Sequence, residues 1–422
     1  MKYRSVKSIL GNVLIASFLA FKSITRGNHW VPILLVVVMS FSFVNLIFTS
    51  SVIAGVMRTL DKQLVDDVYS NVVISPEEDE YYISRVSQLE NEIVRVPGVA
   101  GVAARLDSGA FIEYQWKEKL SPADKGESGT YKITGIDPAQ EAGVTNVHNQ
   151  MIAGTYLDPD DRDEIILGVE IAGGNSAQTE AFLTLGGVDI GDEVRLTYPN
   201  GVQREYTVKG IFRVRHLEVD FQAFVTRTEM ASVLGKNIFD NKASYILVKA
   251  EPGVEESSLI ENFNAIGISG EIRSWQDYGG AQRSTMSTFE IVGSLINGVG
   301  LMVATIIMFI VIYVNVASKK RQIGIMRAIG IARGTIIGSY LIQALFYASV
   351  GIIIGWLMVR FVLIPYSTSN PLDLPMGLVS LTVQPFTLGT STSGLILAAI
   401  LAGIIPAWSI MKQSILKIIK GV

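Results

Sequence analysis

The chain has 422 residues and no cysteine, and 49% of its residues are hydrophobic while only 18% are charged. The lack of thiolates and the presence of only three histidines nearly exclude a zinc site, and a net charge of −4 does not suit a nucleic-acid-binding protein. The composition leaves two classes, a soluble protein of two or three domains and a membrane protein.

The distribution of charge decides between these classes, because four long tracts contain no Asp, Glu, Lys or Arg. These tracts are 27–57, 291–318, 334–359 and 374–411. Each exceeds the ~20 residues needed to cross the hydrocarbon core of a bilayer. The sequence therefore predicts an α-helical membrane protein with four transmembrane helices. The helices are expected at 29–57, 288–318, 334–363 and 392–411.

The first 28 residues carry apolar side chains at helical spacing, surrounded by five Lys or Arg and no acid. The apolar residues are Val6, Ile9, Leu10, Val13, Leu14, Phe18, Phe21 and Ile24. This pattern predicts an amphipathic helix over 1–28 that lies flat on the cytoplasmic face of the membrane. Gly27 and Asn28 favour a break after it over one long bent helix. The first tract is too long for the apolar core of a secretory signal.

Lys and Arg gather at three places that contain no acid: the leader, the segment 319–333 and the tail 412–422. The positive-inside rule places all three, with both termini, on the cytoplasmic side of the cell (inner) membrane. The segment 58–287 and the loop 364–391 are then extracytoplasmic. Because 58–287 holds 37 of the 39 acids against 21 Lys and Arg, it offers no surface for a nucleic acid.

The segment 58–287 alternates helix-like and strand-like stretches, which indicates a large α+β extracytoplasmic domain. Its two ends, 58–136 and 243–287, suggest a split β-α-β-β sheet, that is, a split ferredoxin-like porter subdomain. A helix is expected over 79–96, and 99–106 and 110–116 are expected as two strands. Between the two ends, 137–242 is predicted to be a β-rich insert with a hairpin turn at 199–201.

No stretch carries a catalytic or phosphate-binding motif, because the sequence contains neither G-x-x-x-x-G-K-[ST] nor G-x-S-x-G. We therefore expect no catalytic, cofactor or metal site, and no enzymatic activity of the chain itself. The run DPDDRDE at 158–164 spaces its carboxylates as calcium loops do. Arg162 and the missing glycine favour a solvated turn instead.

The basic and apolar segment KKRQIGIMRAIGIARG, residues 319–334, lies between the second and third predicted transmembrane helices. It predicts a helix that begins near Lys319 and stops at Gly330. One face stacks Ile323, Met326 and Ile329, with Lys320, Arg321 and Arg327 around it. Two interpretations remain open from the residues alone. The helix presses into a groove of a cytoplasmic partner, or the segment rests on lipid headgroups.

The stretch KKRQIGIMRAIGIARGTIIGSYLIQALFYASVGIIIG is similar to the signature of FtsX-like permeases, the membrane subunits of MacB and LolC/LolE type ABC transporters. The order of one span, a large outer domain, three closing spans and the ending IIPAWSIMKQSILKII resembles the same family over nearly the whole chain. In the outer domain the resemblance rests on ITGIDPAQE, IILGVEIA, GDEVRLTYPNG and VKGIF. Many relatives carry Glu where this chain has Gln322 and Gln343, so any ion pair of those acids is in doubt here.

The resemblance implies a mechanism called mechanotransmission. A homo- or heterodimer of permeases works with two copies of a cytoplasmic ABC ATPase, which binds the ATP and Mg, and the long helices carry the ATPase motion to the outer domains. The basic helix is the coupling helix that docks on the ATPase. Its implied docking residues are Lys320, Arg321, Ile323, Ile325, Met326, Arg327 and Ile329.

Two functions follow from the resemblance. The first is extrusion or release of a hydrophobic substrate, such as a lipoprotein, lipid, peptide or drug, on the outer side, with membrane lipids as further partners. The alternative is an FtsX-like signalling subunit that activates an extracytoplasmic cell-wall hydrolase, and the large outer domain favours the first. Gly298, Gly351 and Gly355 are expected at close helix contacts, the alternative being ordinary tolerance of glycine in a bilayer.

Overall fold

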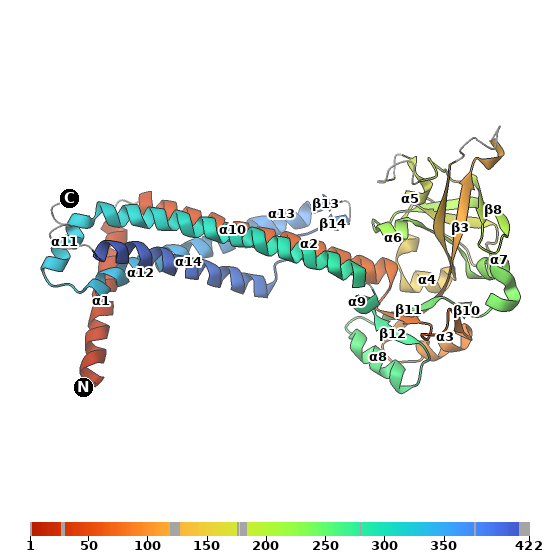
Figure 1. Cartoon of the computed structure of the whole chain (residues 1–422), viewed down its shortest axis with the longest axis horizontal. Coiled ribbons are helices and arrows are strands. Elements are labelled where there is room, and N and C mark those ends of the chain that lie inside the picture. The colour runs from red at the N-terminus through yellow and green to blue at the C-terminus, as the bar shows by residue number, and fades with distance from the viewer. Residues whose placement is uncertain are drawn as a thin grey trace. The chain divides into compact units, whose positions relative to one another are not determined.

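The computed structural model describes residues 2–26, 30–118, 127–174, 177, 184–278, 280–374 and 377–412. The chain divides into two compact units, which contain the elements labelled in Figure 1. The helical unit comprises Met1–Met57, Thr285–Leu374 and Leu378–Val422, and the α/β unit comprises Arg58–Ser284 with Pro375–Gly377. The boundary between the two units coincides with a change in acid content, because the helical unit contains only two of the 39 acids, Glu290 and Asp373.

Four helices in the described part of the chain are long and apolar enough to cross a membrane, as the sequence predicts. They are α2 (Trp30–Gln63), α10 (Gly280–Ser318), α12 (Arg333–Met358) and α14 (Pro385–Met411). One π-helical turn extends α2 over Leu64–Val68, and another over Val359–Leu363 leads from α12 into α13 (Ile364–Ser369). The helices α2, α10 and α12 therefore extend beyond their charge-free tracts, whereas α14 lies inside its tract.

A further difference from the sequence-based bounds is at α14, which begins at Pro385 rather than at 392. Proline is favoured in the first turn of a helix, where its missing N–H costs nothing. The first turns of α14 are rich in Thr and Ser, whose low hydropathy conceals the helix. The predicted loop 364–391 consequently contains α13, two short strands, β13 (Leu372–Leu374) and β14 (Gly377–Val379), and the first residues of α14.

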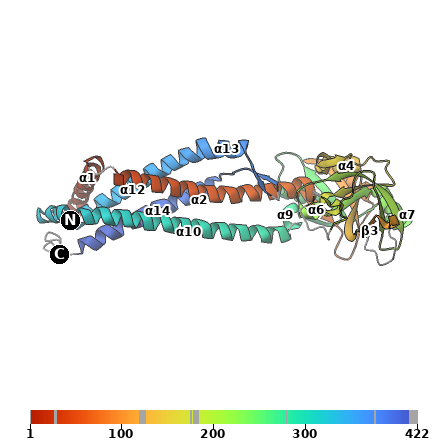
Figure 2. The ribbon, with the colours of Figure 1, turned by 90° about the horizontal axis from the view of Figure 1, so that it is seen from above.

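The helical unit has one hydrophobic core to which all four long helices contribute. Fully buried side chains meet there from α2 (Leu35, Phe43), α10 (Met308), α12 (Tyr347) and α14 (Leu395). Figure 2 shows α2 and α10 side by side over much of their length. The outward faces of these helices are apolar as well, as expected for surfaces that contact lipid.

The leader forms a helix, α1 (Lys2–Arg26), that runs across the direction of the long helices in Figure 1. Ala16 and Ala20 are buried, and Ala16 lies against Gly338 of α12. The larger apolar residues Phe18 and Phe21 are exposed, and this exposed apolar face fits a helix whose surface lies in the membrane interface. The expected break at residues 27–28 lies outside the described residues.

The α/β unit contains a first sheet with strand order β12-β1-β11-β3 and only antiparallel pairs. The strands are β1 (Val72–Ser75), β3 (Val99–Tyr114), β11 (Tyr245–Ala250) and β12 (Glu271–Ser274). Two helices, α3 (Val86–Val94) and α8 (Glu256–Ala265), cover one face through a shared core of aliphatic side chains and Phe263. On the other face lies α4 (Pro138–Val144), through Val144.

The second part of the α/β unit is a small closed barrel, because its pairings return to the strand where they start: β3-β4-β9-β6-β8-β7-β3. The further strands are β4 (Ser128–Ile136), β6 (Glu164–Gly168), β7 (Glu193–Thr197), β8 (Gln203–Phe212) and β9 (Gln222–Thr226), with β5 (Met151–Gly154) beside β8. Closure removes exposed strand edges. Short helices α5 (Val169–Ala172), α6 (Leu217–Asp220) and α7 (Arg227–Phe239) complete this part, and β2 (Ile83–Ser84) pairs with β10 (Lys242–Ala243).

The β-rich part differs from the predicted insert in where it begins. The two strands expected at 99–106 and 110–116 are one strand, β3, whose first half pairs with β11 and whose second half pairs with β4 and β7. Ala104 belongs to the core of the first sheet, and Leu106 belongs to the core of the barrel. The β-rich part therefore starts near Leu106 and not at 137.

Two local predictions have different outcomes. The hairpin is confirmed, because β7 and β8 pair antiparallel with Thr197 opposite Gln203 around the turn at Gly201. The helix expected over 79–96 is too long, because α3 starts only at Val86, after Arg85 in the left-handed conformation (φ +56°). The residues before it form an irregular stretch and β2.

Candidate functional site

The basic segment after α10 forms a short helix, α11 (Lys320–Ala328), as its sequence suggests. Gly330 ends it in the left-handed conformation (φ +97°). The N–H of Gly330 donates to the carbonyl of Arg327, and the N–H of Ile331 donates to the carbonyl of Met326, both at 3.1 Å. These bonds satisfy the last carbonyls of the helix and turn the chain into α12.

The side chains of α11 do not all face outward. Ile323 is completely buried in the core of the helical unit, and Met326 packs half-buried against the same core. This corrects the expected role of Ile323, because a buried side chain cannot enter a groove on another protein. The physical reason is that a helix of two to three turns must bury one apolar face on its own chain to stay in place.

The large exposed apolar residues of this segment are Ile325 on α11 and Ile329 directly after it, with 51% and 73% of their surface accessible. Arg321 beside them is exposed, and Lys320 is half-exposed. Ile329 belongs to the face expected from the sequence, whereas Ile325 lies away from the buried Ile323. We refer to Lys320, Arg321, Ile325, Arg327 and Ile329 as the α11 surface.

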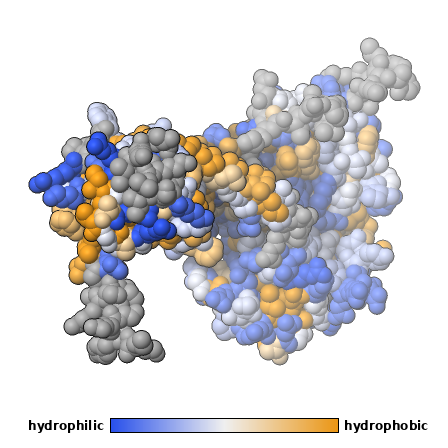
Figure 3. Space-filling view, turned by 60° about the vertical axis from the view of Figure 1, so that its left-hand side comes forward, coloured by the Kyte–Doolittle hydropathy of each residue, from blue (hydrophilic) through white to orange (hydrophobic). Residues whose placement is uncertain are grey.

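Two polar contacts hold α11 to its neighbours in the helical unit. Arg327 donates through Nη1 to the carbonyl of Met411 at the end of α14, at 3.4 Å. Lys319 donates through Nζ to Oγ of Ser23 on α1, at 2.8 Å. Figure 3 shows hydrophilic residues gathered at this end of the helical unit, next to hydrophobic surface. The α11 surface is thus apolar and positively charged, and its segment is held to α14 and α1.

The two positions at which relatives carry Glu differ in their surroundings. Gln322 is exposed on α11, where a carboxylate would be solvated. Gln343 is buried in α12 and donates through Nε2 to the carbonyl of Ser339 at 3.2 Å. Among the described residues its Oε1 has no hydrogen-bond partner. An amide at position 343 avoids burying a charge inside the helical unit.

The glycines expected at close helix contacts separate into two groups. A Cβ at Gly351 would lie 2.5 Å from Cβ of Met39, and one at Gly355 would lie 2.8 Å from Cδ1 of Phe43, so both lie tightly against α2. Gly298 is different, because a Cβ there would meet no atom of the described residues within 4 Å. Gly298 therefore has no packing role within the described part of this chain, in contrast to the expectation.

Three carboxylates of the calcium-like run at 158–164 form ion pairs with one lysine. Nζ of Lys209 lies 2.9 Å from Asp158, 2.7 Å from Asp161 and 2.7 Å from Glu164. Its ammonium group lowers the pKa of Asp161 against the opposing effect of burial. Across the described ranges no group of three or more His, Cys, Asp or Glu is placed to hold a metal ion. The ammonium group of Lys209 thus neutralises the three carboxylates that a calcium ion would otherwise have to bind.

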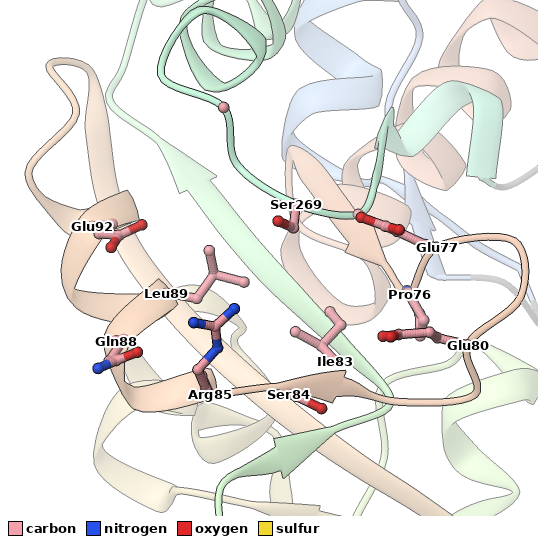
Figure 4. A pocket seen from close by; sticks show the side chains of 12 residues that line it. Pro76, Glu77, Glu80, Ile83, Ser84, Arg85, Gln88, Leu89, Glu92 and Ser269 are labelled. Atoms are coloured by element: carbon pink, nitrogen blue, oxygen red, sulfur yellow. The ribbon is translucent and has the colours of Figure 1, made fainter.

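The α/β unit contains a polar pocket of about 280 Å³ between the start of α3 and the loop before β12. Glu77, Glu80 and Glu92 line it with Arg85, and Figure 4 shows these side chains around the opening. Ile83 and Leu89 form its apolar part. The pocket thus combines charged and hydrogen-bonding groups with a small apolar part.

Two buried acids of the α/β unit were not singled out in the sequence. Burial, with the neighbouring Asp66, raises the pKa of Asp67 from 3.8 to about 7. Burial also raises the pKa of Asp220 from 3.8 to about 6. Their sequence neighbourhoods are ordinary, because burial of an acid depends on which distant segments cover it.

Comparison with known proteins assigns both units. Residues 33–266 match the family described as MacB-like periplasmic core domain, and residues 294–415 match the family described as FtsX-like permease C-terminal. A search of curated proteins gives no match.

Solved structures similar to this chain include two extracytoplasmic domains. The extracellular domain of the noncanonic ABC-type transporter YknZ from Gram-positive bacteria is 14% identical, with a TM-score of 0.32, and the match covers 48% of this chain and 97% of that one. The periplasmic region of MacB from Actinobacillus actinomycetemcomitans is also 14% identical, with a TM-score of 0.35, over 54% of this chain and 98% of that one.

The MacB-like match alone extends over more than half of the 422 residues. The FtsX-like match includes most of α10 and all of α11, α12 and α14. The family is one of membrane permease subunits and not of enzymes. The α/β unit lies within the MacB-like region for most of its length, and the membrane helices occur in the expected order. The chain therefore belongs to the FtsX-like, MacB-type family of ABC transporter permeases.

Proposed function

We propose that this chain is the permease subunit of a mechanotransmission-type ABC transporter. It couples ATP hydrolysis by a separate cytoplasmic ATPase to the extrusion or release of a hydrophobic substrate on the outer side of the membrane. The substrate class comprises lipoproteins, lipids, peptides and drugs. The ATPase, present in two copies, binds the ATP and Mg, and two permease chains, identical or different, complete the assembly.

The observation that carries the proposal is the α11 surface. Ile325 and Ile329 expose apolar area at the end of the helical unit, where exposure to water is unfavourable without a cover. Arg321 beside them adds positive charge that suits an acidic rim. Permeases of this family work with ABC ATPase partners, which supports an ATPase groove as the cover. The anchoring of α11 through Ile323 supports transfer of force from such a partner to α10 and α12.

The proposed orientation of the chain in the membrane rests on the distribution of its Lys and Arg residues. The helical unit contains 14 Lys and Arg, most of them in α1, around α11 and in the tail after α14. These segments are therefore assigned to the cytoplasm, and both termini with them. Residues 58–287 are assigned to the outer side of the cell (inner) membrane. The helix α2 is continuous from Trp30 to Gln63, which suits a rigid element that transmits motion from the membrane to the outer side.

The α/β unit supports handling of the substrate outside the membrane. Its first sheet has the order β12-β1-β11-β3 with α3 and α8 on one face, and we assign it as a split ferredoxin-like porter subdomain. The barrel is an additional domain that a purely signalling subunit does not require. The alternative, an FtsX-like subunit that activates a cell-wall hydrolase, would use the same α11 surface and is not favoured by the MacB-like match.

The test is co-purification of the cognate ATPase with Ile329→Glu and with Gln322→Glu. The first change places a carboxylate in the proposed apolar contact, where desolvation of an unpaired charge typically costs a few kcal/mol. The second adds the same charge at an exposed position that relatives tolerate. We expect Ile329→Glu to reduce ATPase recovery and stimulated hydrolysis at least about tenfold, which corresponds to 1.4 kcal/mol, whereas Gln322→Glu leaves both near wild type.

Met326→Glu is a less specific test, because Met326 also packs on the core of its own chain and the variant would disturb α11 itself. Ile325→Glu provides an independent test of the exposed face. Recovery of each variant from the membrane as a monodisperse protein controls for misfolding. Equal ATPase recovery with Ile329→Glu, Ile325→Glu and Gln322→Glu would refute docking through this surface and leave α11 as a lipid-facing helix.

A further inference from the structure

The helical unit contains a cavity of about 350 Å³ beside the start of α11. Its walls come from α1, α2, α10 and α12. Most of the lining is aliphatic, with Val31, Leu34, Val311 and Val314 as examples. Its volume lies at the lower end of the range for small-molecule sites, which is sufficient for part of a lipid chain.

One end of this cavity is polar and positively charged. Lys319 lines it together with Ser23, Asn315 and Ser318. The ammonium group of Lys319 donates to Oγ of Ser23 at 2.8 Å, and no ion pair of Lys319 is present within the described part of the chain. Burial lowers the pKa of Lys319, and no acidic neighbour counteracts that effect.

The sequence explains why no carboxylate reaches this lysine. The helical unit has two acids, Glu290 and Asp373, and Glu290 lies at the opposite end of α10. At 1.5 Å per residue, the helix separates positions 290 and 319 by roughly 40 Å. A half-buried ammonium group that lacks a carboxylate within its own chain requires another anion or water to satisfy its three donors.

We infer that this cavity binds one anionic phospholipid, with its phosphate on Nζ of Lys319 and an acyl chain between α2 and α10. Charge complementarity selects the headgroup, because a phosphate oxygen accepts a charge-assisted hydrogen bond from the ammonium group. The aliphatic walls favour an acyl chain, because burial of apolar surface stabilises the complex. The inference goes beyond the proposed transport function and uses only its orientation, which places Lys319 in the leaflet where anionic lipids are enriched.

This site differs from general attraction of the membrane surface to basic residues. Surface lysines attract anionic lipid without an apolar pocket, and an apolar groove attracts any acyl chain without charge. Here one lysine closes one end of a cavity whose remaining walls are mostly apolar. The combination predicts a single retained lipid that depends on both the charge of Lys319 and the open space beside Val314.

The experiment uses the full chain alone, without ATPase, in nanodiscs made of phosphatidylcholine with a minor fraction of phosphatidylglycerol. After extraction into mild detergent and extensive washing, mass spectrometry counts the lipids that remain bound. We expect wild type to retain about one phosphatidylglycerol per chain. Lys319→Gln removes the charged donor and is expected to reduce this retention about tenfold, whereas Lys319→Arg keeps it.

Two further variants separate the two halves of the site. Val314→Trp fills the cavity and leaves Lys319 in place, and it is expected to lose the lipid as Lys319→Gln does. Arg333→Gln removes the same charge from an exposed position outside the lining and is expected to retain it.

Retention of phosphatidylcholine in the same amount as phosphatidylglycerol would overturn the inference, since the headgroup would then not be recognised. Equal losses with Arg333→Gln and Lys319→Gln would also overturn it, because bulk positive charge would explain the binding. Recovery of a stable dimer without any retained lipid would show that a second copy of the chain covers the cavity. None of these outcomes bears on ATPase docking, which is measured with different variants.

Discussion

The ion pair between Arg105 and Glu141 provides the most direct test of how the α/β unit is held together. Arg105 lies in β3 where that strand passes from the first sheet into the barrel, and Glu141 lies on α4. The two side chains are only 2% and 1% exposed. The guanidinium donates to both carboxylate oxygens, at 3.1 Å and 2.5 Å.

The surroundings of this pair connect several segments of the α/β unit. Nη1 of Arg105 also donates to the carbonyl of Val68, in the π-helical turn after α2, at 3.2 Å. Oγ1 of Thr145 donates to Glu141 at 2.6 Å, and the guanidinium lies 5.8 Å from the ring centre of Phe224 in the barrel. Burial alone would lower the pKa of Arg105, but Glu141 keeps it well above its ordinary value.

We expect Glu141→Gln to destabilise the α/β unit by about 3–5 kcal/mol, because it leaves a buried guanidinium charge without its counterion. That is a large part of the ~5–15 kcal/mol that stabilises a typical domain. The double variant with Arg105→Met and Glu141→Leu should recover much of the loss, since apolar replacement of a whole buried pair is often close to neutral. Lys117→Met, at the exposed pair of Lys117 with Glu193, should have little effect on stability, because water screens an exposed ion pair.

The assay is urea unfolding of a fragment of residues 58–284, followed by tryptophan fluorescence. This fragment is expected to unfold cooperatively, because it contains its own two hydrophobic cores. A non-cooperative transition of the unmodified fragment would show that the unit depends on the membrane helices. A cost for Glu141→Gln no larger than that for Lys117→Met would refute the assignment of a buried, fully paired charge.

Three further predictions concern orientation, helix packing and pH. A cysteine introduced at Thr197 should react with a membrane-impermeant thiol reagent in intact cells and one at Ser318 should not, and the reverse pattern would overturn the assignment of the cytoplasmic side. Gly351→Val should reduce the thermal stability of the detergent-purified chain by several degrees, because its Cβ would collide with α2, whereas Gly298→Val, in open space, should leave it unchanged. The raised pKa of Asp67 means that its contribution to stability is fully present below about pH 4 and is lost as the pH rises to about 7. Asp67→Asn should therefore stabilise the 58–284 fragment at pH 8 by as much as ~4 kcal/mol and have little effect at pH 4, and equal effects at both pH values in urea unfolding would contradict the raised pKa.

The sequence by itself determined the membrane part and many of the local elements. Charge-free tracts longer than 20 residues locate the four helices because a charge in the bilayer core is costly, and this rule does not depend on tertiary contacts. The hairpin at Gly201 was equally predictable, because its turn residues and alternating strands are local signals. The α11 helix and its end at Gly330 follow from a short basic, apolar segment and one glycine.

Only the tertiary structure decided which surfaces these elements use. The sequence alone assigns the same helical face to Ile323 and Ile329. Ile323 is nevertheless buried on its own chain and Ile329 is exposed, because packing into the core of the helical unit selects one part of that face. The strand β3 serves two sheets because its first half pairs with the distant strand β11, and its second half pairs with the next strand, β4, and with β7. The cavity at Lys319 arises where four helices meet, and such a convergence leaves no local pattern, since each segment contributes only a few lining residues. Periodicity and charge predict elements and their membrane placement, whereas burial and recognition depend on contacts between residues that are distant in sequence.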